Sequence, residues 1–450
     1  MDLRTSKIKV IVAASLLFCL GPNVALPQSI EPDSTSKESA QQETITVDEA
    51  FRDEVALNAV ETVLNPRFGK LTLNPGLDTG VGFDDNVFFI ESKSARSSDT
   101  YLETSPEFRI RYGDFLEPGD LVEPNFIEFS YKYFRRDYFE YDLINAENHF
   151  LNLNSQLNFG RLKITGNDQV IIQSDLVTRG VGTATTDSDF IPQDVARGIE
   201  DRISINDTYR GELDLTERTD LYLEGSHRST NFSKNSRFLD SRILKALTGY
   251  QFALSDQTFL FGEVFYGQVE NDPNSPLQIK GPNAQFLGGF AGIRGDITTR
   301  IKGVIKAGYE SRWFDGGQPE GFDSPVFSVG LQYAPLDRTI IFLNFDRSLL
   351  LSNQVTNLGV IRDQVRLTLA QYLGSSSKWS VQFGLTYQHE DFQKTPVVFE
   401  TYLATAGLNY QIQEWLSTSL SYSHEDFKPT NAFVQSYEVN RVNLRLSIGY

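Results

Sequence analysis

The chain has 450 residues, a formal net charge of −18 and a mean hydropathy of −0.30. The acidic balance argues against nucleic acid as a partner, because that binding depends on neutralising phosphates with Lys and Arg. The sequence has no uninterrupted apolar run of about 20 residues, which excludes a helical membrane protein.

Residues 1–26 have the three parts of a secretory signal: a basic start, an apolar core and a region with small residues. The basic residues are Arg4, Lys7 and Lys9. The apolar core covers residues 10–20, which is too short to cross a bilayer as a helix. We therefore predict a cleaved signal peptide, with cleavage after Ala25.

The single cysteine, Cys19, lies within this predicted signal. A lipoprotein site at Cys19 is the alternative to simple cleavage, but Phe18 is bulky for the position before a lipidated cysteine. After cleavage the chain would contain no cysteine, which excludes thiol catalysis, cysteine metal sites and disulfides and suits an oxidising envelope. We expect no cofactor.

Residues 27–67 are predicted to form a disordered periplasmic segment that contains one short amphipathic helix. Residues 28–44 are rich in Ser, Glu and Gln and nearly lack large apolar residues, which is typical of disorder. Thr46 and Glu49 resemble a capping box, and apolar residues then recur at roughly helical spacing as far as Val63. The helix either docks a periplasmic partner or packs on the rim of the next domain.

Residues 68–450 alternate between short strands and turns, and every second connection is tight except the first, at 113–124. About eighteen strands, with short turns at one end and long loops at the other, are typical of a transmembrane antiparallel β-barrel. With an even number of strands, the first strand begins and the last strand ends on the same side of the membrane, which is the periplasmic side. The predicted strands cover residues 70–83, 101–112, 125–136, 148–158, 161–173, 202–215, 219–231, 241–253, 257–269, 284–295, 300–312, 325–334, 339–350, 363–373, 378–390, 400–411, 414–426 and 438–450.

The faces of these strands support a membrane barrel. Every second residue of 379–387 is apolar, and residues 402–410 repeat this pattern. Because successive side chains of a strand point to opposite faces, we expect the apolar face on lipid and the polar face on a water-filled lumen. Trp313, Trp379 and Trp415 lie near strand ends, where aromatic girdles meet the membrane surface.

The last predicted strand has an apolar residue at every second position up to the terminal aromatic residue. These residues are Val442, Leu444, Leu446, Ile448 and Tyr450. The pattern resembles the C-terminal signal that the outer-membrane assembly machinery reads in β-barrels. The alternative is an ordinary amphipathic strand of a soluble β-sandwich.

Short motifs in the rising strands are similar to those of a known family. Residues 71–89 run LTLNPGLDTGVGFDDNVFF, and an aromatic–polar–aromatic pattern recurs as YFRRDYF (133–139), YESRWF (309–314), YQHEDF (387–392) and YSHEDF (422–427). Over residues 68–450 the chain resembles the putative beta-barrel porin 2 family of Gram-negative outer membranes. The resemblance implies an outer-membrane barrel among lipid and lipopolysaccharide, and an association with exopolysaccharide export or biofilm systems and their partner proteins.

If the barrel is a channel, its inward residues are the functional surface. A basic set would favour anionic solutes such as an acidic polysaccharide. Glu107, Glu128, Glu224 and Glu263 are expected on the same face, so the alternative is a wall of mutually compensating ion pairs. The basic pore-lining candidates are Arg109, Arg111, Lys132, Lys163, Arg294, Lys302, Lys306, Arg366 and Arg445.

The motif His-Glu-Asp-Phe occurs twice, at 389–392 and 424–427. Two rising strands separated by one falling strand would bring both copies to one rim, where they could hold a divalent cation. The candidate ligands are His389, Glu390, Asp391, His424, Glu425 and Asp426. The alternative is a duplicated girdle motif with solvated charges, and we assign no metal site.

Catalysis has little support in the sequence. The four histidines lie at or near strand ends, and no Gly-x-Ser-x-Gly elbow is present for acyl transfer. We therefore expect no enzyme and no catalytic residue; an outer-membrane-embedded hydrolase is the remote alternative.

The long loop 174–201 is the third at its end of the predicted barrel, and it either bends into the lumen or stays outside. Together these features predict a porin-like conduit, which the resemblance links to exopolysaccharide export or biofilm formation. The alternative is a structural or adhesive barrel that acts through its extracellular loops.

Overall fold

The computed structural model describes residues 67–89, 96–114, 125–176, 190–191, 199–233, 239–273, 283–315, 321–354, 357–374, 378–393, 397–430 and 436–449. The predicted signal peptide, the predicted segment and helix up to residue 66, and Tyr450 lie outside these residues. Within them, no helix is long and apolar enough to cross a membrane.

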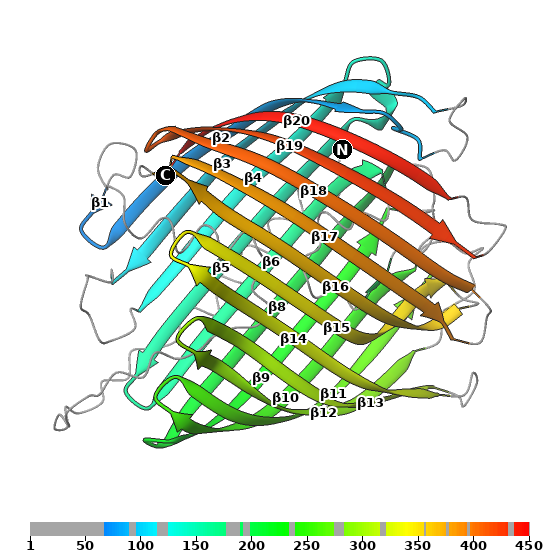
Figure 1. The fold of residues 1–450 in the computed structure, drawn as a ribbon. Coiled ribbons are helices and arrows are strands. Elements are labelled where there is room, and N and C mark those ends of the chain that lie inside the picture. Colours follow the sequence, from blue (N-terminus) through cyan, green and yellow to red (C-terminus); the bar gives the residue numbers. More distant parts are fainter. Residues whose placement is uncertain are drawn as a thin grey trace, which may run out of the picture. The chain divides into compact units, whose positions relative to one another are not determined.

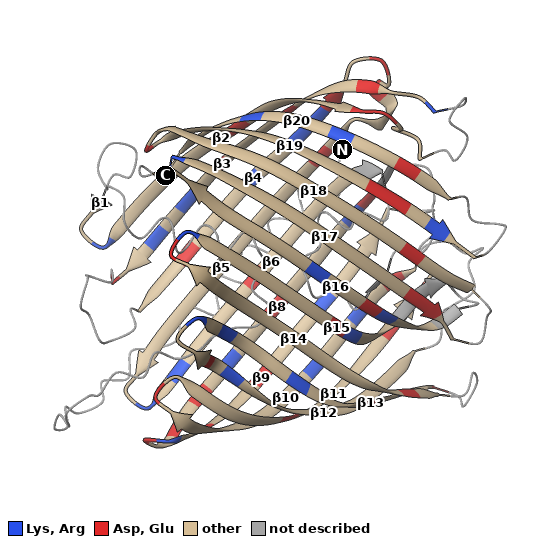
Figure 2. Ribbon diagram, viewed as in Figure 1, with Lys and Arg blue, Asp and Glu red and all other residues tan. Residues whose placement is uncertain are grey.

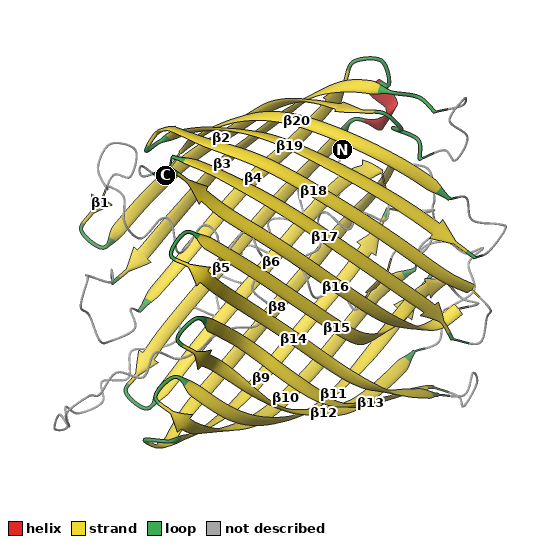
Figure 3. Ribbon diagram, viewed as in Figure 1, coloured by secondary structure: helices red, strands yellow, loops and turns green. Residues whose placement is uncertain are grey.

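The described residues form 18 long strands and two strands of two residues each. The short ones are β1 (Arg67–Phe68) and β7 (Phe190–Ile191). The long ones are β2 (Leu71–Asp84), β3 (Asp99–Gly113), β4 (Phe126–Tyr138), β5 (Ala146–Phe159), β6 (Leu162–Leu176), β8 (Ile199–Thr216), β9 (Thr219–Phe232), β10 (Asp240–Ser255), β11 (Thr258–Asp272), β12 (Ala284–Thr298), β13 (Ile301–Phe314), β14 (Phe322–Leu336), β15 (Thr339–Gln354), β16 (Asn357–Leu373), β17 (Trp379–Phe392), β18 (Val397–Gln413), β19 (Leu416–Pro429) and β20 (Tyr437–Gly449). Figure 3 shows how completely strands dominate, with the 3-10 turn η2 (Asp142–Ile144) as the helical element of the described residues.

The sheet closes on itself. Long strands that are neighbours in sequence pair antiparallel, and β2 also pairs with β20, from Gly76 opposite Gly449 to Asp84 opposite Arg441. A closed ring leaves no strand edge exposed, so the oblique strands of Figure 1 form a barrel. The predicted antiparallel β-barrel of about eighteen strands is confirmed.

Connections at one end of the barrel are tight, except the one between β3, which ends at Gly113, and β4, which begins at Phe126. β8 ends at Thr216 and β9 begins at Thr219, and the β5–β6 turn contains Gly160 at φ +68°. The left-handed region is open to glycine because it has no Cβ. Short turns are typical of the periplasmic end of an outer-membrane barrel, so we distinguish a short-turn end from a long-loop end.

The two faces of the sheet differ in exposure. On β10, Leu244, Tyr250 and Phe252 are 41%, 46% and 39% exposed, whereas Ile243 and Leu247 are 4% and 7% exposed. Large apolar side chains therefore cover the outside of the barrel, as contact with lipid hydrocarbon requires. We call this the outer face, and we call the side toward the lumen the inner face.

The inner face is less uniformly polar than the alternation predicted. A buried cluster on β9 to β14 includes three aromatic residues, each directly opposite a glycine on a neighbouring strand. The pairs are Tyr222–Gly249, Phe286–Gly267 and Phe265–Gly288. A Cβ on these glycines would lie 2.2, 2.1 and 2.4 Å from a ring atom. The glycines thus let the rings lie against the wall instead of projecting into the lumen.

Candidate functional site

Inner-face charges on β3 and β4 form a row of ion pairs. Arg109 lies 3.3 Å from Glu107 and 3.8 Å from Glu128, and Arg111 lies 3.9 Å from Glu128. Lys132 Nζ lies 3.9 Å from Glu107 Oε2. These basic candidates therefore face the acidic residues expected beside them. Figure 2 shows charges of both signs scattered over the strands, between long uncharged stretches.

Arg445 contacts the buried carboxylate of Glu103 at the seam where the barrel closes, and its own side chain stays partly exposed. Glu103, which is 3% exposed, receives a contact of 2.6 Å from Arg136 Nη2 and one of 3.1 Å from Arg445 Nη2. Asn443 Nδ2 donates to the second carboxylate oxygen of Glu103 at 2.6 Å. One carboxylate on β3 thus joins side chains from β4 and β20, which gives Arg445 a structural role.

Three further basic candidates are spread around the inner face. Lys302 Nζ lies 3.7 Å from Asp296 Oδ2 at the short-turn end. Lys163 on β6 stands opposite Glu212 on β8, and Arg366 lies on β16. The structure therefore does not gather the predicted basic residues into one stripe.

The acidic candidates on β9 and β11 surround Tyr222. Its hydroxyl donates to Glu263 at 2.7 Å, and Arg210 lies 3.8 Å from Glu224. The guanidinium of Arg210 stands 3.8 Å from the ring centroid of Tyr222, and that of Arg294 stands 5.6 Å from it. The sequence analysis did not single out Arg210, although it is an inner-face residue of β8 by the same alternation.

Next to this group lies a cluster of two lysines and two phenylalanines, which we call the lysine–phenylalanine cluster. Lys245 Nζ lies 4.9 Å from the ring centroid of Phe265, and Lys306 Nζ lies 4.8 Å from that of Phe290. The two rings are stacked, with centroids 5.5 Å apart and an interplanar angle of 27°. Of these four residues the sequence analysis named Lys306 alone, because β10 and β11 carry apolar residues on both faces.

Neutral amides occupy part of the inner face of β5, β6 and β8. Asn206 Nδ2 donates to Gln169 Oε1 at 3.0 Å, and Arg228 Nε donates to Asn206 Oδ1 at 2.9 Å. Asn167 donates to Asn154 in the same way. Amide groups donate hydrogen bonds to water and hydroxyl groups and accept hydrogen bonds from them, and they carry no net charge that would create a strong electric field in the lumen.

Between β6 and β8 the structure describes one further pair of residues, the short strand β7. This strand pairs in parallel with β15, Phe190 opposite Leu351 and Ile191 opposite Ser352. β15 lies on the far side of the ring from β6 and β8 in strand order. Phe190 and Ile191 are therefore attached to the opposite wall of the barrel.

A row of aromatic rings lines the inner face at the long-loop end. Phe89, Tyr437, Phe427, Phe399 and Phe392 follow one another with centroid distances of 5.0, 5.1, 5.4 and 4.7 Å. All five are buried. The row runs along β20, β19, β18 and β17 and stiffens the wall near the mouth.

Strand alternation divides the two His-Glu-Asp-Phe motifs between the faces. His389, Asp391, His424 and Asp426 belong to the outer face, and Glu390 and Glu425 to the inner face. His389 Nδ1 lies 3.7 Å from Glu400 Oε1, while Glu390 is 1% exposed. The six candidate ligands therefore do not converge, and the described part of the chain contains no group of three or more His, Cys, Asp or Glu residues suited to a metal.

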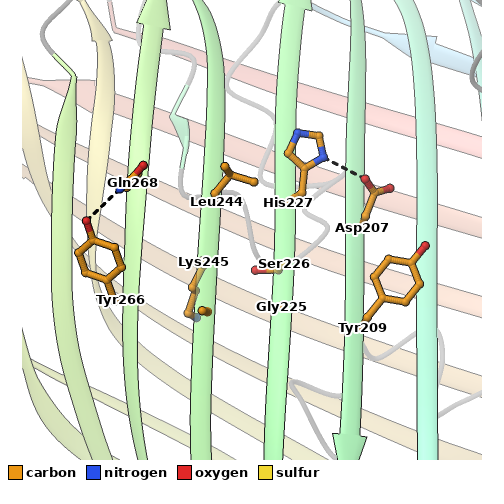
Figure 4. A pocket seen from close by; sticks show the side chains of 10 residues that line it. Asp207, Tyr209, Gly225, Ser226, His227, Leu244, Lys245, Tyr266 and Gln268 are labelled. Atoms are coloured by element: carbon orange, nitrogen blue, oxygen red, sulfur yellow. Dashed lines mark hydrogen bonds and ion pairs between the residues drawn. The ribbon is translucent and has the colours of Figure 1, made fainter.

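A hollow of about 440 Å³ lies on the outer face of β8 to β11. Gly225 and Ala246 leave space between Tyr209 and Tyr266, and His227 Nδ1 lies 2.9 Å from Asp207 Oδ2 above it. Figure 4 shows this histidine directed at the aspartate. Because the hollow opens away from the lumen, it is not part of a channel path.

The last strand presents the predicted apolar residues to the outside. Val442, Leu444 and Leu446 are 41%, 56% and 36% exposed, and Ile448 stands opposite Leu77 at the seam. Their role as an assembly signal stays a prediction.

A family model matches the C-terminal part of the chain. Residues 283–450 match the family described as Putative beta-barrel porin 2. The match covers the strands from β12 to β20, so the resemblance inferred from short motifs is confirmed there. A search of curated proteins found no match.

Solved outer-membrane structures are similar at low identity. OpdK of Pseudomonas aeruginosa, solved with vanillate, is 9% identical over 84% of this chain and 99% of its own, with a TM-score of 0.45. OpdQ of the same organism is 9% identical over 84% and 98%, with a TM-score of 0.44. OccAB3 of Acinetobacter baumannii is 10% identical over 84% and 99%, with a TM-score of 0.42. Likeness of this degree assigns no solute to the present chain.

Proposed function

We propose that this porin-like outer-membrane β-barrel is a passive conduit for a hydrophilic polymer and serves as the outer-membrane component of exopolysaccharide export or biofilm formation. It carries out no chemical step in this role. Lipid and lipopolysaccharide surround its outer face, and other proteins of the export system deliver the polymer.

The observation that carries the proposal is the polar inner face of a wide ring. Barrels of sixteen to eighteen strands are too wide for their own side chains to fill, and they leave an aqueous lumen. Ion pairs such as Arg109–Glu128 and the amide network around Asn206 give this wall groups that water can solvate. A barrel with no solvated interior would gain nothing from these polar rows.

The saccharide class rests on two supports. Amide and hydroxyl groups exchange hydrogen bonds with sugar hydroxyls about as well as with water, so a sugar chain can slide without being trapped. The resemblance to the porin family, carried by residues 283–450, implies an association with exopolysaccharide systems. A polymer also needs one continuous path, which a single wide barrel offers.

A structural or adhesive barrel is the second candidate, and one observation favours it. The two residues of β7, which lies between β6 and β8 in sequence, pair with β15 on the far side of the ring, and such a contact would narrow the mouth at the long-loop end. A barrel that is closed there would act through its outer surface and loops instead of its lumen.

Single-channel conductance of the purified chain in a planar bilayer tests the conduit. A steady current with ohmic behaviour, together with entry of neutral polyethylene glycols into the pore, would support an open lumen. Absence of any current from correctly folded protein would support the closed structural barrel. Folding is checked independently by the heat-dependent shift of the barrel on a denaturing gel.

The saccharide assignment is tested in cells. Deletion of the gene should reduce extracellular polymer and retain it in the periplasm, whereas uptake of small solutes should change little. Normal polymer release by the deletion strain would contradict the export role even if the purified barrel conducts.

A further inference from the structure

Lys245 and Lys306 differ from Arg109 and Arg111 in the groups that lie beside their charges. Each ammonium lies over an aromatic ring, and neither lysine forms an ion pair with a residue that the structure describes. Both are partly exposed on the inner face. By contrast, Arg109 and Arg111 lie beside carboxylates.

The difference matters for the charge that reaches the lumen. A carboxylate cancels the charge of its partner and occupies its hydrogen-bond donors. An aromatic ring attracts a cation through its quadrupole but carries no net charge, and it accepts no strong hydrogen bond. The two lysines therefore keep their positive charge and their donors available to a passing group.

Four glycines shape the wall around these side chains. Lys245 stands opposite Gly267, Phe265 opposite Gly288, Phe290 opposite Gly308 and Lys306 opposite Gly292. Every member of the lysine–phenylalanine cluster thus has a neighbour without a side chain. The ring of Phe286 lies over Gly267 and that of Phe265 over Gly288, so these two glycines let the rings lie flat against the wall. Lys245, Lys306 and the Phe290 ring stay partly exposed, and a ligand in the lumen can reach them.

The acidic residues nearest in the register are already engaged. Glu263, opposite Phe290, accepts from the Tyr222 hydroxyl, and Arg312 Nε donates to Glu310 at 2.5 Å. The guanidinium of Arg312 also stands 4.9 Å from the ring centroid of Phe286. The carboxylates of this wall therefore have donors other than the two lysines.

We infer that the lysine–phenylalanine cluster is a binding site for an acidic sugar chain, in which the ammonium groups of Lys245 and Lys306 each take the carboxylate of a different uronate unit and the Phe290 ring takes the apolar face of a sugar. The inference rests on the proposed conduit, and it identifies the polymer as one that contains uronate residues. Lys245 on β10 lies over the Phe265 ring and Lys306 on β13 lies over the Phe290 ring, so each ammonium group belongs to a different ring of the stacked pair. Because each uronate unit would bind to the site and then be released, acidic units would pass through the barrel more slowly than neutral ones.

A current-block experiment tests the site. A tri-uronate is added to the wild-type barrel in a planar bilayer, and its carboxyl-reduced trisaccharide serves as the neutral counterpart of equal size. We expect block by the acidic sugar at concentrations where the neutral one has no effect. Equal block by the two sugars would overturn the inference.

Variants localise the effect. In the double variant Lys245→Gln, Lys306→Gln, we expect the dissociation constant for block to rise about a hundredfold, because two charged hydrogen bonds are lost and each accounts for about a factor of ten. The pair Lys245→Arg, Lys306→Arg should retain block, and Phe290→Leu should weaken it while keeping both charges. The control Arg161→Gln, Arg218→Gln removes the same charge from two exposed tight turns, between β5 and β6 and between β8 and β9, and should leave block unchanged; an equal loss in this control would refute the assigned site.

Calorimetry on the barrel in detergent keeps the two proposals separable. If the wild-type chain conducts no current but binds the tri-uronate through Lys245 and Lys306, the conduit fails and the binding site stands. If the chain conducts but binds no tri-uronate, the binding site fails and the conduit stands.

Discussion

Tyr222 and Gly249 stand directly opposite each other on β9 and β10, and the tyrosine ring fills the space that a larger residue at position 249 would need. The same ring receives the guanidinium of Arg210, and its hydroxyl donates to Glu263. One glycine on the inner wall thus makes room for a residue that organises the charges around it.

We expect Gly249→Ala to destabilise the barrel. The added Cβ would lie 2.2 Å from the Tyr222 ring, and overpacking of this kind costs about 1–3 kcal/mol. Urea unfolding in detergent micelles measures the change. The matched control is Gly225→Ala on the outer face of β9, where a Cβ would meet nothing within 4 Å. Equal stability of the two variants would show that the ring moves freely.

We expect Glu103→Gln to weaken closure of the barrel. The substitution leaves Arg136 and Arg445 without their shared carboxylate, and breaking a buried pair costs about 3–5 kcal/mol. Folding yield and unfolding in urea are the measurements, because β3, β4 and β20 meet at this residue.

A surface ion pair supplies the control for that substitution. Lys70 and Asp114 lie just outside β2 and β3, with Nζ 2.6 Å from Oδ1. The hydrogen bond from Lys70 lowers the pKa of Asp114, but the pair is exposed to water, so Asp114→Asn should leave unfolding almost unchanged. A comparable loss in both variants would mean that burial of Glu103 is not the cause.

The double substitution Arg109→Gln, Arg111→Gln should shift ion selectivity toward cations. It removes two positive charges and leaves Glu107 and Glu128 facing the lumen. The reversal potential in a salt gradient reports the shift. The fourfold variant that also changes Glu107 and Glu128 to Gln should return the potential toward the wild-type value. An unchanged potential in the double variant would place these residues outside the ion path.

We expect Ile191→Pro to increase single-channel conductance. Proline has no amide N–H and is disfavoured in paired strands, so it should detach β7 from β15. Barrel stability should be unaffected, because the closing pairs between β2 and β20 are remote from this contact. Unchanged conductance with normal folding would show that the attachment of β7 to β15 does not narrow the mouth.

The strands were predictable where the two faces differ in polarity. Residues 379–387 alternate strictly, and β17 (Trp379–Phe392) forms there with its apolar side chains outward. β16 begins at Asn357, six residues before the predicted start at residue 363. Its backbone pairing with β15 continues from Asp363 back to Asn357. Local pattern thus locates a strand, and the neighbouring strand determines its length.

The lumen site was less predictable. Around Phe265 both faces of β11 carry aromatic residues, so alternation does not reveal which ring lies inside. The glycine opposite each ring is the missing signal, and it becomes visible once the register is known. Ion pairs such as Arg136–Glu103 join separate strands and likewise have no signature within one strand.

The sequence alone determined that this chain makes about eighteen short amphipathic strands with tight and long connections in turn, because side-chain alternation and turn residues are local properties. Only the tertiary structure decided which lumen charges are cancelled and which stay available, because that depends on register and ring closure, which bring Lys245, Phe265, Phe290 and Lys306 together from four different strands.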